Sequence, residues 1–205
     1  MTTTTGRYTR LPRSQRRVQL LDAAQEVFVE AGYHAAAMDT IAERAGVSKP
    51  VLYQHFPSKQ ALYLALLDQH CNAIVSMVEQ ALADNQDNKQ RVAAAIDAYF
   101  SFFEQNGSPA RLVFESDLTG EEPVRTRLDS VALRCAEAIA AVIAEEAGLR
   151  TDQALLLGMA LTGAAMQSAK HWVTQGQSVP RAEATRLVSA LNWRGLGGFP
   201  RTQAG

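Results

Sequence analysis

The sequence lacks several features that would each define a class of protein. Its 205 residues include only two cysteines, Cys71 and Cys135, which excludes a fold held together by disulfides. Acidic and basic side chains nearly balance, 21 against 20, and 47% of the residues are hydrophobic, which excludes a disordered chain. No apolar run approaches the roughly 20 residues of a membrane helix, and no signal-peptide pattern opens the chain. We therefore expect a globular cytoplasmic protein without a membrane segment.

The sequence motifs of common enzyme sites are missing as well. There is no Gly-rich phosphate loop, no Gly-x-Ser-x-Gly nucleophile elbow and no His-Glu-x-x-His zinc motif. The four histidines are scattered, and the neighbours His70 and Cys71 would diverge on a helix, which is poor geometry for a metal. We expect no enzyme activity, no cofactor and no metal site.

Hydrophobic residues recur with helical spacing almost throughout. Leu20, Ala24, Val27 and Phe28 share one helix face, and Gly32 follows where that helix should end. No segment shows the period-two alternation of a strand. The pattern predicts an all-α fold of about nine helices, with Ser48, Ser58 and Thr151 as N-caps. The expected segments are 14–31, 38–45, 48–56, 59–83, 90–106, 112–114, 124–147, 151–174 and 181–193.

Two short predicted helices, 38–45 and 48–56, are separated by Gly46 and Val47. Ala42 and Ala45 are small enough to let these helices approach closely, and Gly46 permits a tight turn. This spacing is typical of a DNA-binding helix-turn-helix, although an ordinary helical hairpin gives the same pattern. The second helix would turn a cation, an amide, an imidazole and a phenol outward, which suits base edges in the major groove.

Positive charge is concentrated near the N-terminus. Residues 1–60 contain eight Lys/Arg and five Asp/Glu, whereas the remaining 145 contain twelve and sixteen. Arg7, Arg10 and Arg13 precede the first predicted helix and could lie along phosphates or in a narrow minor groove. A solvated basic tail is the alternative.

One stretch carries a specific set of motifs. Leu20–Phe28 is followed by Ala31-Gly-Tyr33 and by a run from Met38 to Tyr63 that contains Gly-Val-Ser, Leu-Tyr-Gln-His-Phe and Ser-Lys in that order. From Ser14 to Leu67 the sequence resembles the N-terminal domain of TetR-family transcriptional regulators. The resemblance implies a flexible basic arm (1–13), a three-helix helix-turn-helix domain (14–60), a helical effector-binding and dimerisation domain (61–195) and a tail (196–205). It further implies a homodimeric repressor that a small, largely apolar effector releases from a palindromic double-stranded DNA operator.

Matched position by position, the resemblance also implies which residues touch DNA. Lys49, Pro50 and Tyr53 stand where the family approaches bases and phosphates, and His55 and Lys59 stand where it contacts the backbone. The family commonly has Ser or Thr just before the second helix, where this chain has alanine at 35–37, so Thr40 is the expected substitute. The predicted DNA-binding set is Thr40, Lys49, Pro50, Val51, Tyr53, Gln54, His55 and Lys59.

Aromatic residues gather in the predicted helix 90–106 and just beyond it. An aromatic stripe of this kind either packs in a core or lines a ligand pocket. For the pocket we predict Tyr99, Phe103, Arg111, Phe114, Glu115, Met166 and Gln167. The charge of the effector stays open, because Glu115 favours a cation and Arg111 a carboxylate.

Small residues, among them Gly158 and Gly163, recur in the predicted helix 151–174. They either permit tight packing inside one subunit or form a four-helix interface with a second copy. The resemblance implies a homodimer through the eighth and ninth helices, 151–174 and 181–193. A helical small-molecule carrier without operator DNA binding is the alternative function, which would explain the aromatics but not residues 49–59.

Overall fold

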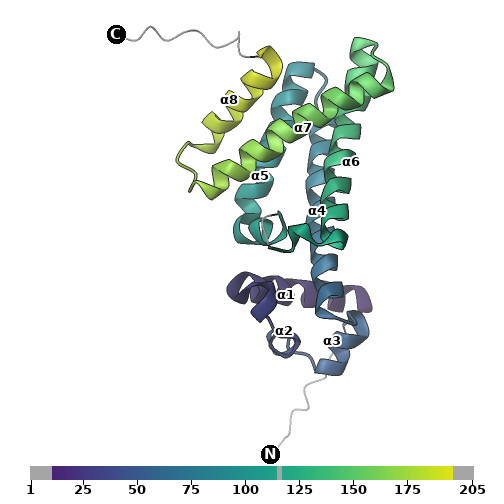
Figure 1. Cartoon of the computed structure of the whole chain (residues 1–205), viewed down its shortest axis with the longest axis vertical. Helices are drawn as coiled ribbons and strands as arrows, with labels where there is room; N and C mark the ends of the chain where they lie inside the picture. The colour runs from purple at the N-terminus through teal and green to yellow at the C-terminus, as the bar shows by residue number, and fades with distance from the viewer. Residues whose placement is uncertain (1–10, 115–116, 196–205) are drawn as a thin grey trace, which may run out of the picture. The chain divides into compact units, whose positions relative to one another are not determined.

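The computed structural model describes residues 11–114 and 117–195, and the side chains of 108–114 and 117 are not described. Every regular element in this part of the chain is helical, as the sequence predicts. The elements are α1 (Arg13–Ala35), α2 (Met38–Arg44), α3 (Lys49–His55), α4 (Lys59–Ala83), α5 (Asn88–Phe114), the 3-10 helix η1 (Asp117–Gly120), α6 (Glu122–Ala147), α7 (Thr151–Thr174) and α8 (Arg181–Arg194) (Figure 1). The described residues form eight α-helices and not the expected nine, because the segments 90–106 and 112–114 both belong to α5, which is interrupted at Gly107.

The chain divides into two compact units between Leu66 and Leu67. Residues Lys59–Leu66 of α4 belong to the first unit and the rest of α4 to the second. The boundary that we expect after residue 60 stays a prediction.

The first unit is built on the apolar face of α1. The predicted face residues Leu20, Ala24, Val27 and Phe28 are all buried, and α1 packs against α2, which packs against α3. The Phe28 ring lies 5.9 Å from the ring of Tyr63 in an edge-on arrangement. α1 breaks at Gly32, where the sequence predicts its end.

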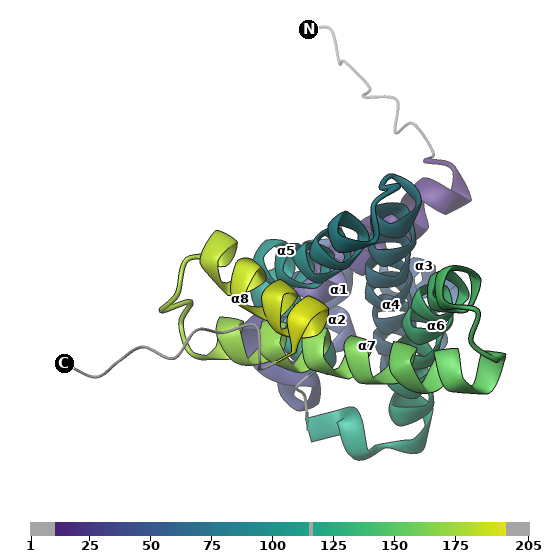
Figure 2. The same cartoon turned by 90° about the horizontal axis from the view of Figure 1, so that it is seen from above.

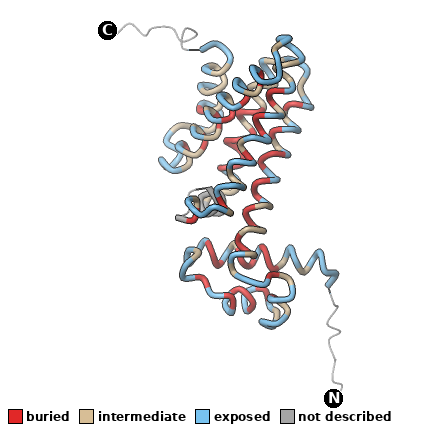
Figure 3. The backbone as a smooth tube through the Cα atoms, turned by 45° about the vertical axis from the view of Figure 1, so that its right-hand side comes forward, coloured by how far each residue is buried: buried red, intermediate tan, exposed pale blue. Residues whose placement is uncertain are grey.

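The second unit is a helical bundle. α7 packs against α6 and α5, and α8 folds back beside α5 and α7 (Figure 2). Buried positions recur along each helix between exposed ones (Figure 3). Phe100, Phe102 and Phe103 are each at most 1% exposed, so most of the aromatic stripe on α5 forms core.

The helix N-termini differ in part from the predicted caps. The Ser58 hydroxyl accepts a hydrogen bond from the N–H of Ala61 at 3.0 Å, which confirms the predicted cap of α4. Ser48 occupies the N-cap of α3, but its hydroxyl makes no capping bond. The prediction for Thr151 is wrong, because Arg150 is the N-cap of α7 and its N–H donates to the side chain of Gln153 at 3.2 Å.

α4 is more apolar than the sequence analysis predicts, since no membrane-length apolar segment is expected there. This helix has 25 residues and is long and apolar enough to cross a membrane, judged by length and composition only. Half of its most apolar stretch is buried inside the structure. The core helix of a soluble protein passes the same test, so this is weak evidence for a membrane span.

Candidate functional site

The turn between α2 and α3 is tight because one residue adopts a conformation that glycine favours. Gly46 has a φ of +63°. The N–H of Val47 donates to the carbonyl of Ala42 at 3.0 Å, and the side chain of Gln19 on α1 donates to the carbonyl of Ala45 at 2.8 Å. The two short helices therefore form a helix-turn-helix, and α1 holds its turn in place.

α3 has one buried face and one exposed face. Leu52 and Phe56 are at most 2% exposed and anchor the helix in the first unit. The residues on the other face are exposed, except for Val51 and His55, which are half-buried. The exposed ones are Lys49, Pro50, Tyr53 and Gln54. This short helix presents polar and aromatic groups to solvent, as a recognition helix does for the edges of bases.

Lys49 begins α3 and is paired with a carboxylate of α2. Its Nζ lies 2.8 Å from Oδ1 of Asp39, and this hydrogen bond raises the pKa of Lys49. Both side chains are exposed, so the pair is screened by water and salt. A phosphate could therefore replace Asp39 as the partner of Lys49.

Arginines of α1 lie beside the C-terminal half of α3. Arg13 and Arg16 line a surface hollow together with Gln54 and His55, which we call the basic hollow. Leu11 and Val51 complete its walls. None of the described residues that line the hollow is acidic, so it suits a phosphate. The sequence indicates Arg13 as a DNA contact, but it does not show that Arg16 joins the predicted residues of α3.

The arginines also influence His55. Burial lowers the pKa of His55, and the positive charges of Arg13, Arg17 and Arg16 lower it further. The imidazole is therefore neutral at pH 7, when it can both donate and accept a hydrogen bond. The guanidinium of Arg17 stacks on the ring of Phe56, 4.4 Å from its centroid, which fixes α1 against the end of α3.

The remaining two predicted DNA contacts lie outside α3. Thr40 is exposed in the first turn of α2. The Nζ of Lys59 instead donates to the carbonyls of Tyr33, His34 and Ala36 at 2.8, 3.0 and 2.9 Å. An ammonium group has three N–H donors, so these carbonyls occupy all of them. Lys59 thus fastens the end of α1, and a phosphate would have to displace one of these bonds.

The second unit contains a partly open apolar cavity of about 330 Å³ between α5, α6, α7 and α8, with Leu82 of α4 at its wall. This volume lies at the lower end of the range for small-molecule sites. Aliphatic side chains form most of its wall, with Tyr99 as the aromatic member from α5. The aliphatic residues of the wall are Leu82, Val92, Ala95, Ile96, Ile139, Val142, Ile143, Ala147, Leu161 and Ala165.

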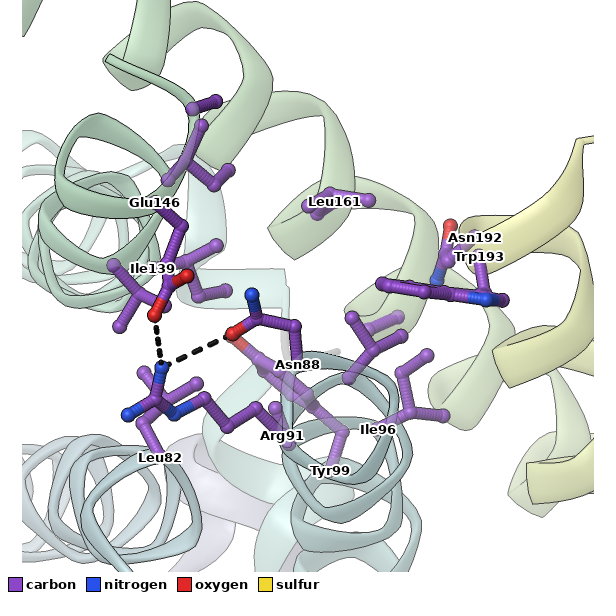
Figure 4. A pocket seen from close by; sticks show the side chains of 16 residues that line it. Leu82, Asn88, Arg91, Ile96, Tyr99, Ile139, Glu146, Leu161, Asn192 and Trp193 are labelled. Carbon is purple, nitrogen blue, oxygen red and sulfur yellow. Dashed lines mark hydrogen bonds and ion pairs between the residues drawn. The ribbon is translucent and has the colours of Figure 1, made fainter. Parts of the chain in front are cut away.

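Polar side chains lie at two sides of this cavity. Arg91, Asn88 and Glu146 gather on one side, and Asn192 and Trp193 of α8 lie on the other (Figure 4). Nη1 of Arg91 is 3.0 Å from Oδ1 of Asn88 and 3.2 Å from Oε1 of Glu146. The cavity therefore suits a ligand that is apolar along most of its length and polar at an end.

Tyr99 adds a polar atom to the interior of the cavity wall. Burial is the main cause that raises the pKa of Tyr99, so its hydroxyl stays protonated. This hydroxyl and that of Thr162 are buried without a partner in hydrogen-bonding geometry among the described residues. Cys135 and Thr162 are nevertheless close enough to influence the same pKa. Of the two residues, only Tyr99 lines the cavity, so its hydroxyl is the one that a polar atom of a ligand could approach.

Of the seven residues predicted for the effector site, Tyr99 lines this cavity. Phe103 lies in the core, where its ring packs edge-on against Phe102 at 5.4 Å. Met166 is half-buried and Gln167 is exposed, and neither lines the cavity. Glu115 and the side chains of Arg111 and Phe114 lie outside what the structure describes. The lining residues that sequence reasoning missed come mainly from α5 and α6, with fewer from α4, α7 and α8.

α7 and α8 expose large apolar side chains. Leu156 is 71% exposed, and Leu157, Met159, Leu187 and Leu191 are exposed as well. A soluble monomer rarely exposes a large apolar patch, so this surface is a candidate interface.

Within the described parts of the chain, no group of three or more His, Cys, Asp or Glu side chains could hold a metal ion.

Comparison with known proteins agrees with the helix-turn-helix geometry. The family described as bacterial regulatory proteins, tetR family, matches residues 20–66. The HTH-type transcriptional activator FasR of Mycolicibacterium smegmatis is 43% identical over 195 residues, which cover 95% of this chain and 89% of FasR. The solved structure of a TetR-like transcriptional regulator from Rhodococcus sp. RHA1 is also similar, with a TM-score of 0.72 and 28% identity. The match covers 93% of this chain and 100% of the Rhodococcus chain. The structure of FadR from Bacillus subtilis, solved in complex with stearoyl-CoA, matches 87% of this chain and 98% of FadR with a TM-score of 0.70. At 22% identity this match shows the shared fold.

These relatives are transcriptional regulators and not enzymes, in agreement with the sequence analysis. Since the similarity to FasR extends over nearly the whole of both proteins and the helix-turn-helix is in place, the chain belongs to the TetR family of transcriptional regulators.

Proposed function

We propose that this regulator binds a palindromic operator as a homodimer, through the exposed face of α3, and that a fatty-acyl effector controls its affinity for DNA. The observation that carries the proposal is the division of α3 into a buried face and an exposed polar face. The predicted alternative, a carrier without operator DNA binding, is set aside because the helix-turn-helix belongs to the family match. A regulator of bacterial genes works in the cytoplasm, where the DNA is.

The proposed operator contacts come from three places. Lys49, Tyr53 and Gln54 of α3 face the bases and nearby phosphates, and the basic hollow holds a backbone phosphate against Arg13 and Arg16. Pro50, Val51, His55 and Thr40 complete the surface. Lys59 takes part only if it gives up a bond to α1.

A second copy covers the exposed apolar residues of α7 and α8 in this proposal. Gly163 supports it, because a Cβ built on this glycine would meet no described atom within 4 Å beyond its own helix. Glycine inside a helix costs about 1 kcal/mol relative to alanine, so packing within the subunit does not explain it. Close approach of a helix from a partner subunit would explain why this position is glycine. Two α3 helices could then reach successive major grooves about 34–36 Å apart.

The effector fills the cavity between α5 and α8. Its aliphatic wall suits an acyl chain, and the stearoyl-CoA complex of FadR supports this class of ligand. Such an effector changes DNA affinity only if it binds the DNA-competent and the DNA-incompetent states unequally.

The sense of regulation depends on where the operator lies. Our prediction from the sequence is a repressor, whereas FasR, the relative that matches nearly the whole chain, is named an activator. A reporter fused to the target promoter separates the two roles. Deleting the regulator raises expression if it is a repressor and lowers expression if it is an activator.

DNA binding is tested by fluorescence anisotropy on the DNA upstream of the protein's own gene. Tyr53→Ala and Gln54→Ala should each weaken binding by about 1–3 kcal/mol if the side chain contacts a base. Gln69→Ala, an exposed glutamine on the part of α4 in the second unit, is the matched control and should bind like wild type. Wild-type affinity in both α3 variants, with unchanged melting temperatures, would overturn the proposal.

A further inference from the structure

The side chain of Arg91 is mostly buried at the polar side of the cavity. It is 18% exposed and lines the cavity among aliphatic residues. Nε donates to the carbonyl of Asn85 at 2.8 Å, which fixes the orientation of the group. A buried charge in this position requires a compensating anion.

The hydrogen bonding of Arg91 is incomplete. A guanidinium has five N–H donors, and Asn85, Asn88 and Glu146 accept three bonds from them. The two N–H groups of Nη2 have no partner among the described residues. They are therefore available to donate to an oxyanion.

Glu146 is a weak counter-ion for Arg91. The 3.2 Å separation exceeds the roughly 2.7–2.9 Å of a strong charge-assisted bond, and the Glu146 side chain is 45% exposed. Glu146 also lies one residue from the C-terminal end of α6, where the helix dipole disfavours a negative charge. An anion that arrived with an apolar chain could displace it.

We propose that Arg91 binds the oxyanion head group of a single-chain amphiphile, and that Glu146 is the resting counter-ion which this head group displaces. This inference rests on the proposed effector cavity and adds the chemistry of one end of the effector. The chain lies against the aliphatic wall, and the head group makes a bidentate contact with Arg91. The oxyanion is either the carboxylate of a free fatty acid or a phosphate of an acyl-CoA.

Isothermal titration calorimetry with three ligands of one chain length tests the proposal. Dodecanoate and dodecanoyl-CoA carry oxyanions, and dodecanol does not. Glu146→Gln should bind the anionic ligand about fivefold to tenfold more tightly, because the amide competes less for Arg91. Arg91→Gln should bind it at least about tenfold more weakly, and Arg91→Lys should restore part of the affinity. Dodecanol should bind all variants alike.

Glu145→Gln is the matched control, since Glu145 is exposed and does not line the cavity. Thermal melting in the absence of ligand shows whether each variant folds. An effect of Arg91→Gln on dodecanoate alone identifies a carboxylate head, and an effect on dodecanoyl-CoA alone identifies a phosphate.

Two outcomes overturn the proposal and can be told apart. If dodecanol binds as tightly as the anionic ligands and Glu146→Gln changes nothing, the role of Arg91 is wrong while the cavity remains the effector site. If the wild-type protein binds none of the three ligands, the fatty-acyl cavity itself is wrong.

Discussion

At the scale of single residues, Lys59 shows how one cation can fit two roles. In the sequence, Lys59 stands where the TetR family contacts the DNA backbone. In the structure, its ammonium group donates to three backbone carbonyls at the end of α1. It also lies 4.7 Å from the centre of the Tyr33 ring. Its loss should therefore affect folding before it affects DNA binding.

Replacing Lys59 with Met should lower the free energy of unfolding by about 1–3 kcal/mol, because carbonyls at the end of α1 lose their donor. Urea denaturation measures this change. Lys89→Met, at an exposed position on α5, is the control and should stay within about 0.5 kcal/mol of wild type. Wild-type stability combined with weaker DNA binding in Lys59→Met would instead support the phosphate contact.

His70 predicts a pH dependence of stability. Burial lowers the pKa of His70 below the usual 6.5, so near that pH the unfolded chain binds a proton that the folded chain does not. The contribution of His70 to stability is therefore complete above pH 6.5 and decreases as the pH falls from 6.5 towards the lower pKa of the folded state. Urea midpoints should fall between about pH 7.5 and about pH 5.5.

His70→Phe should lose a smaller part of its stability over the same pH range, because the titrating group is gone. His34→Gln, which removes an exposed histidine, is the control variant. An equal loss of stability in His70→Phe and wild type would show that other groups cause it.

At the scale of elements, the two glycines of α7 have different surroundings. A Cβ on Gly158 would lie 2.4 Å from the carbonyl oxygen of Ala136 on α6, so the two helices touch there backbone to backbone. A Cβ on Gly163 would meet no atom of another described helix within 4 Å. One glycine serves packing inside the subunit, and the other faces the proposed partner.

Gly158→Ala should lower the free energy of unfolding by about 1–3 kcal/mol, because α7 must move away from α6. Gly163→Ala should leave the subunit folded and even raise its helix stability, while it weakens the dimer. Sedimentation and thermal melting separate these effects. An undisturbed dimer in Gly163→Ala would place the partner elsewhere.

The sequence predicts the helices well because periodicity and helix ends are local properties. The buried face of α1, the break at Gly32 and the end of the predicted helix 124–147 agree with the structure. The turn between α2 and α3 could be predicted for the same reason, because Gly46 and the two short helices beside it are close together in the sequence.

The cavity could not be predicted in this way. Tyr99 and Phe103 share a face of α5, yet only Tyr99 borders the free space, because the neighbouring side chains of α6, α7 and α8 decide where a void remains. Arg91 and Glu146 are 55 residues apart in the sequence, and helical spacing gives no register between two helices. The basic hollow was missed for the same reason, since it depends on how α1 crosses α3.

At the scale of the whole molecule, charge is divided unequally along a chain whose net charge is only −1. The excess of basic residues falls in the part that carries the helix-turn-helix, and the acidic excess falls in the rest. Long-range attraction to DNA should therefore come from the first part, in a way that salt screens. Arg7 and Arg10 of the predicted arm lie outside the described residues, and Arg13 begins α1.

Replacing Arg7, Arg10 and Arg13 with Ala should flatten the salt dependence of DNA binding, by roughly 0.9 in the log–log slope for each phosphate that the arm neutralises. Anisotropy titrations across a range of salt concentrations measure the slope. The control replaces the exposed Arg125, Arg134 and Arg150 of the second unit, which changes the net charge equally. The arm does not touch DNA if both triple variants keep the wild-type slope.

The connection between α7 and α8 is fixed by an indole. The Nε1–H of Trp172 donates to the carbonyl of Val179 at 2.6 Å, and its ring packs 5.4 Å from that of Phe100. A hairpin fastened in this way is preorganised, so two subunits that meet through it would lose little conformational entropy in ordering the loop. Association should then resemble the docking of rigid bodies, with most of the ordering already achieved when each monomer folds.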